Sequence, residues 1–113
     1  MKSFLIILLL MFMWSNAIAG TGSGKVTRIY AHPKFTNGVD TGVILFNVEI
    51  HNDAPASCPG SEWAFNADTE HGKAMYALLL SAAAQGKPVY VRGAGDCADW
   101  GDRERPSWIS VTY

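Results

Sequence analysis

The N-terminal segment limits how much of this chain can fold into a domain. Lys2 precedes an apolar run from Phe4 to Trp14. The run has the length of a signal-peptide hydrophobic region and is shorter than the ~20 residues that span a bilayer. Ala17-Ile18-Ala19 has the small-residue pattern of a cleavage site. We therefore expect a signal peptide over residues 1–19, cut before Gly20, with an uncleaved membrane anchor as the alternative.

The remaining chain, residues 20–113, is long enough for a single small domain. A domain of about 94 residues has a thin core, so a covalent cross-link would help to stabilise it. Cys58 and Cys97 are the only cysteines, and two cysteines in an exported protein indicate a disulfide. The alternative, a metal or redox pair, lacks a Cys-x-x-Cys motif, and none of the three histidines has ligand spacing to either cysteine. We expect a Cys58–Cys97 disulfide in a secreted or periplasmic protein, with no membrane span after cleavage.

The charge balance disfavours two classes of partner. Without Lys2, eight lysines and arginines stand against ten acids, a net charge near −2. No basic surplus is available to neutralise phosphates, so we expect no nucleic-acid binding. The same balance disfavours attachment to anionic membranes. The glycines of residues 20–24 superficially suggest a phosphate loop, but the required spacing is missing, and we expect a mobile lead there.

Hydrophobic patterning predicts five short strands. Asn37-Gly38 is a strong hairpin-turn signal between the first two. Trp63 and Phe65, two apart in the third, are expected to share a core-facing side. The predicted strands cover residues 25–32, 42–50, 62–67, 88–93 and 108–113.

One helix is predicted between the third and fourth strands. Asp68 or Thr69 can cap its start, and Gly86 occupies the usual position after its last turn. An apolar stripe at helical spacing predicts the face that packs on the core. The stripe consists of Met75, Leu78, Leu79 and Ala82.

This order of elements predicts a mainly β fold with one helix. Three strands, a helix and two strands is the order of an OB-fold, a five-stranded Greek-key barrel. Barrel closure would also remove exposed sheet edges. The alternative is an open α+β sheet with the helix on one face.

The segment from Gly93 to Trp108 is rich in charged residues and would form the loop between the last two strands. Its acids are Asp96, Asp99, Asp102 and Glu104. They lack the spacing of a helix–loop–helix calcium site, and interleaved arginines can neutralise them. We expect a self-paired, ligand-facing loop without a metal, and a weak calcium site remains the alternative.

Outward-facing aromatic and polar side chains are the candidate binding residues. Aromatic faces can stack on sugar rings, while arginine and amide groups make directional hydrogen bonds. The alternative is that the aromatics fill an oligomer interface. The candidates are Tyr30, Asn47, Tyr90, Arg92, Trp100 and Trp108. No serine-nucleophile motif is present and the domain has little volume for a buried cleft, so we expect no enzyme and no cofactor.

Several segments resemble one known family. GVILFNVEI, EWAF and GKAMYALLLSAAAQGKPVYV, with the cysteine pair and the Ala-x-Ala signal, are similar to the B subunits of bacterial pentameric A–B toxins. The subtilase-cytotoxin and typhoid-toxin branch is closer than the cholera-toxin branch. The resemblance implies an exported OB-fold pentamer that binds glycans, and it assigns no sugar-contacting residue. The other hypothesis is a periplasmic interaction or inhibitor module that acts on a protein ligand as a monomer.

Overall fold

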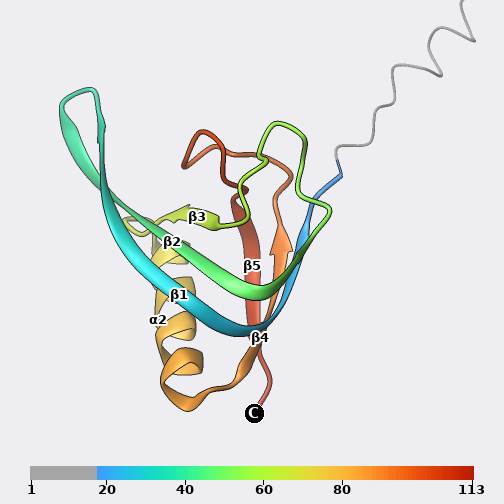
Figure 1. The fold of residues 1–113 in the computed structure, drawn as a ribbon. Coiled ribbons are helices and arrows are strands. Elements are labelled where there is room, and N and C mark those ends of the chain that lie inside the picture. The colour runs from blue at the N-terminus through green and yellow to red at the C-terminus, as the bar shows by residue number, and fades with distance from the viewer. Residues whose placement is uncertain (1–17) are drawn as a thin grey trace, which may run out of the picture.

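The computed structural model describes residues 18–113, so most of the expected signal peptide, residues 1–17, lies outside the described residues. The elements follow one another as five strands with one helix between the third and fourth (Figure 1). They are β1 (Thr21–Thr36), β2 (Val39–Asn52), β3 (Trp63–Asn66), α2 (Glu70–Gln85), β4 (Pro88–Gly93) and β5 (Pro106–Val111). The predicted order and the mainly β class are confirmed. No helix in residues 18–113 is long and apolar enough to cross a membrane.

All five strands belong to one antiparallel sheet in the order β3-β2-β1-β4-β5. The sheet is not closed into the barrel that we expected. The edge strand β3 meets the segment just before β5 at one parallel bridge between Trp63 and Glu104, where the Ala64 amide donates to the Glu104 carbonyl oxygen at 3.0 Å. Closure stops there because β3 is only four residues long and leaves little backbone to pair.

The β1–β2 hairpin is longer than the sequence indicated and its tip projects from the body of the domain (Figure 1). Its turn is confirmed at Asn37-Gly38, where φ is 51° and 77°, the left-handed pair that two-residue hairpins require. The predicted mobile lead at residues 20–24 is wrong. Thr21 already begins β1, and its backbone pairs with both β2 and β4.

Glycine at position 22 explains why this lead forms a strand. A Cβ on Gly22 would lie 3.0 Å from the Trp63 ring nitrogen and 3.0 Å from a Val48 methyl group. The missing side chain therefore lets β1 lie directly over the core. A register shift between Ser23 and Val26 follows, and such bulges bend the strand that carries them.

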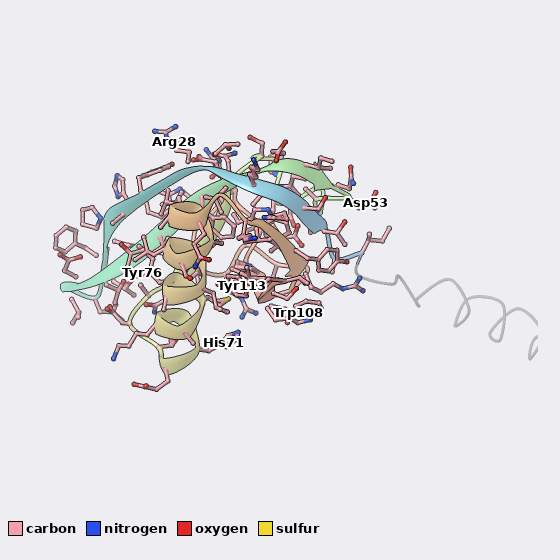
Figure 2. The ribbon with its side chains drawn as sticks, turned by 90° about the horizontal axis from the view of Figure 1, so that it is seen from below. Arg28, Asp53, His71, Tyr76, Trp108 and Tyr113 are labelled. Atoms are coloured by element: carbon pink, nitrogen blue, oxygen red, sulfur yellow. A yellow bond between two sulfur atoms is a disulfide. The ribbon has the colours of Figure 1, made fainter. Side chains whose placement is uncertain are left out.

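The core lies between α2 and the sheet. Trp63 and Phe65 are fully buried in it, as predicted, and so are three of the four stripe residues of α2, while Leu78 is 37% exposed. Thr69 caps the helix by accepting the Gly72 amide at 2.9 Å, and Gly86 ends it at φ 62°. Figure 2 shows α2 against one side of the β1–β2 ribbon and Arg28 on the opposite side.

The predicted disulfide between Cys58 and Cys97 is present, with a Cα–Cα distance of 5.7 Å. It ties the loop after β2 to the loop between β4 and β5. Disulfides persist in oxidising compartments, and this one is consistent with such a location.

We predict that Leu79→Ala lowers the free energy of unfolding by about 2–5 kcal/mol, because it leaves a cavity in the core. Leu79 is fully buried, whereas the adjacent Leu80 is 45% exposed. Leu80→Ala is the matched control and should change stability by no more than about 0.5 kcal/mol. Urea denaturation measures both, and equal effects of the two substitutions would contradict this packing.

We also predict that reduction of the disulfide lowers the unfolding free energy by roughly 4 kcal/mol, the chain-entropy value for a 39-residue separation. Denaturation with and without reductant measures it. A Cys58→Ala/Cys97→Ala chain is the control and should not respond to reductant. An unchanged midpoint in the wild-type chain would show that the cross-link does not stabilise the fold.

Candidate functional site

Two of the four acids in the loop between β4 and β5 are paired with the loop's own arginines. Arg105 donates from Nε and Nη2 to the two carboxylate oxygens of Asp96, at 2.9 and 2.8 Å. Arg103 pairs with Asp102 at 2.6 Å and with Glu62 at 3.2 Å. Within residues 18–113, no group of three His, Cys, Asp or Glu side chains is placed to hold a metal ion. Asp96 and Asp102 are thus paired with the arginines of their own loop, as the self-paired interpretation predicted, whereas the Asp99 carboxylate accepts the Asn66 amide at 3.0 Å.

Glu104 differs from the other acids of this loop. It was expected among solvated or paired loop acids, and its side chain is instead fully buried. Its carboxylate accepts the Gly20 amide at 2.8 Å and lies 3.2 Å from Nε2 of His51. One indication for this position was present in the sequence: Glu104 lies two residues before the last strand, where alternation can turn a side chain inward.

Tyr30 and Trp100 lie together on the face of the β1–β2 ribbon away from α2. Both pack against a small buried cluster of Val43, Leu45 and Ala64. The Tyr30 hydroxyl donates to Glu62 at 2.9 Å, and the Arg28 guanidinium lies 4.4 Å from the Tyr30 ring centroid. Burial, and then the Glu62 carboxylate, raise the pKa of Tyr30 above its ordinary value.

Trp100 and Asn47 are also engaged with the protein. Trp100 is half-buried and meets His32 edge-on, with ring centroids 4.8 Å apart. The Asn47 amide donates to the Ser61 carbonyl at 3.4 Å. These contacts give Tyr30, Asn47 and Trp100 structural partners, so they are less available to a ligand than solvent-exposed side chains would be.

A pocket of about 290 Å³ lies between the β1–β2 hairpin and the β4–β5 loop. Lys34 and Asp99 both line it, and the Lys34 ammonium donates to the Asp99 carbonyl at 2.8 Å. The remaining lining residues are Thr36, Thr41, Val43, Asn66 and Ala98. The pocket therefore lies at the loop that the sequence singled out, although Trp100 is not among its walls.

Tyr90, Arg92 and Trp108 come together on the solvent side of β4 and β5. Arg92 is the cross-strand partner of Trp108. The rings of Tyr90 and Trp108 have centroids 5.5 Å apart, and the two side chains are 40% and 44% exposed. Trp108 lies at the open surface in Figure 2. Three of the six predicted site residues thus form one exposed aromatic and cationic patch.

Neighbouring strands surround this patch with hydroxyl groups. Residues paired across a sheet share a face. Thr21 pairs with Arg92, and Ser23 pairs with Tyr90, while Ser110 pairs with Tyr90 from the other side. We call these six residues the outer face: Thr21, Ser23, Tyr90, Arg92, Trp108 and Ser110. Sequence reasoning missed Thr21 and Ser23 because it assigned them to a mobile lead.

Comparison with protein-family models, with curated proteins and with solved structures finds no match for this chain.

The Asp96–Arg105 ion pair affects how the Asp96 carboxyl group titrates. Hydrogen bonds from Arg105 lower the pKa of Asp96 below its ordinary value. Because the Asp96 pKa is lower in the folded than in the unfolded chain, the pair stabilises the fold at pH values above the ordinary aspartate pKa of about 3.9. This stability is lost as the pH falls through the lower pKa of the folded state. The contribution is small because the Asp96 side chain is 43% exposed.

We predict that Arg105→Gln raises the Asp96 pKa toward its ordinary value, as measured by NMR titration of the carboxyl carbon. Arg103→Gln is the matched control, because Arg103 pairs with Asp102 and Glu62 instead. It should leave the Asp96 titration unchanged. Equal shifts in the two variants would show that general charge, rather than this pair, sets the value.

Proposed function

We propose that this protein is an exported, non-catalytic binding domain that recognises glycans, in the manner of a toxin B subunit. The observation that carries the proposal is the exposed pair of aromatic rings, Tyr90 and Trp108, beside the cationic Arg92. The disulfide supports export, because such bonds persist outside the reducing cytosol.

The outer face has the chemistry that a sugar needs. A sugar ring presents an apolar face of C–H groups, which packs on an aromatic ring, and a rim of hydroxyls. Arg92 offers guanidinium donors, and the Thr21, Ser23 and Ser110 hydroxyls can both donate and accept. Tyrosine and tryptophan add large contact areas with few rotatable bonds. A nucleic-acid backbone would need more positive charge than this face carries.

An open face of this kind favours weak binding at each copy. Tight small-molecule sites are usually concave, whereas the Tyr90 and Trp108 side chains are 40% and 44% exposed on the solvent side of β4 and β5. Weak single-site affinity is multiplied when several copies bind together. We propose a homo-oligomer, a pentamer if the toxin resemblance holds. The edge strands β3 and β5 offer unpaired backbone for contacts between copies.

We further propose that the fold is an open variant of the OB-fold. The element order and the parallel bridge between Trp63 and Glu104 support it, because that bridge brings β3 to the segment leading into β5, the two edges that a closed barrel would pair.

A second candidate function is a monomeric interaction or inhibitor module. It is favoured by the tip of the β1–β2 hairpin, where Phe35 and Val39 are 71% and 61% exposed. An apolar tip that projects from the body could enter a groove on a protein ligand. Size-exclusion chromatography with light scattering separates the two candidates, because this one requires a monomer.

We predict that Trp108→Ala abolishes binding on a glycan array and leaves the melting temperature within a few degrees of wild type, since Trp108 is 44% exposed. Phe35→Ala is the matched control. It removes an exposed aromatic at the hairpin tip and should leave glycan binding intact.

Loss of glycan binding in Phe35→Ala, with binding retained in Trp108→Ala, would assign binding to the hairpin tip. A wild-type protein that binds no glycan and runs as a monomer would favour the protein-interaction module and contradict the glycan proposal.

A further inference from the structure

The buried carboxylate of Glu104 has unusual surroundings. Its side chain has no exposed area, and a carboxylate removed from water is costly unless it is paired. The partners of this carboxylate in the described residues are the Gly20 amide, at 2.8 Å, and His51 Nε2, at 3.2 Å. Neither is a permanent cation, since histidine carries charge only when protonated.

The space around the carboxylate admits only glycine at two positions. A Cβ added at Gly20 or at Gly93 would overlap the Glu104 carboxylate. The Gly93 amide also donates to the Gly20 carbonyl oxygen at 2.8 Å. Gly20 is therefore held from both ends, with its nitrogen directed at the carboxylate and its carbonyl fixed by β4.

Gly20 is also the residue expected to become the N-terminus. The chain leaves the interior immediately before it: Gly20 is buried, and Ile18 is 67% exposed. Hydrolysis of the Ala19–Gly20 bond adds the hydroxyl of water to the Ala19 carbonyl carbon. The Gly20 nitrogen gains the other hydrogen of that water and, at neutral pH, takes up a further proton, which balances the proton released by the new Ala19 carboxyl group. One amide donor thus becomes an ammonium with three donors and a positive charge.

We propose that Glu104 is a buried receptor for the α-ammonium that signal-peptide removal creates on Gly20. The 2.8 Å separation is already that of an ammonium–carboxylate hydrogen bond. Processing therefore supplies the missing cation and locks the start of β1 into the sheet. The unprocessed chain has the same strand order with an incompletely compensated carboxylate. This inference rests on cleavage before Gly20 and is independent of glycan recognition.

The test compares domains with defined N-termini. One begins at Gly20, made with a protease that accepts glycine after its cut, and the other keeps Ala19 as an additional first residue. Each is also made with Glu104→Gln. We expect the Gly20 form to have at least a tenfold smaller unfolding constant than the Ala19 form. With Glu104→Gln the difference should vanish.

Glu49→Gln is the matched control. The Glu49 carboxylate also accepts a backbone amide, that of Lys25 at 2.7 Å, at an exposed position. This variant should keep the full difference between the two N-termini. Equal stability of the two N-termini in wild type would overturn the proposal, and so would a difference that persists in Glu104→Gln.

A second measurement needs no substitution and decides the matter if Glu104→Gln does not fold. An amine-reactive acylating reagent near neutral pH should label the Gly20 α-amine at least tenfold more slowly in the folded domain than in urea. The Ala19 α-amine should show little protection. Equal labelling of the folded and unfolded Gly20 forms would overturn the proposal. A mature exported protein whose sequenced N-terminus is not Gly20 would also overturn it.

Discussion

The buried contact between the Glu104 carboxylate and the Gly20 nitrogen joins parts of the sheet that are far apart in the sequence. The Glu104 side chain fixes the start of β1, while the Glu104 backbone oxygen accepts a hydrogen bond from the Ala64 amide of β3. The ring of His51, which touches the same carboxylate, stacks on Trp63 with centroids 4.0 Å apart. An acid at this position requires partners because burial removes its water. The start of β1, the edge strand β3 and the entry to β5 consequently meet at one buried polar centre.

The outer face depends on this centre. Thr21 follows Gly20 directly, and Arg92 precedes Gly93, whose amide donates to the Gly20 carbonyl oxygen. Thr21 pairs with Arg92, and Arg92 pairs with Trp108, which sets the row of side chains that we propose as the ligand contact. The disulfide and the Asp96–Arg105 pair order the adjoining loop. A rigid support of this kind limits the entropy lost when a ligand binds.

Local patterns predicted the elements well, and long-range contacts explain what they missed. Apolar alternation, the Asn37-Gly38 turn, the Thr69 cap and Gly86 sufficed for the strands, the helix and their order, because each acts within a few residues. The outward placement of Tyr90, Arg92 and Trp108 was predicted correctly because outward positions on short strands follow from period two. The lead at residues 20–24 was misread, since five small polar residues resemble a linker. Their strand pairing depends on Trp63, Glu104 and β4, and the most distant of these contacts, Gly20 to Glu104, spans 84 residues of the chain. Barrel closure was overestimated because the order of elements does not reveal how short β3 is.

Native-state hydrogen exchange on the domain beginning at Gly20 tests the central role of this polar centre most directly. The Ala64 and Gly93 amides donate to Glu104 and Gly20, respectively. We predict that both exchange only through global unfolding, with the same free energy as the amides at the middle of β2. The contrary result is exchange of these two amides through local opening, at a much lower free energy than for amides at the middle of β2. It would show that the fold does not depend on the polar centre around Glu104, and would contradict this account.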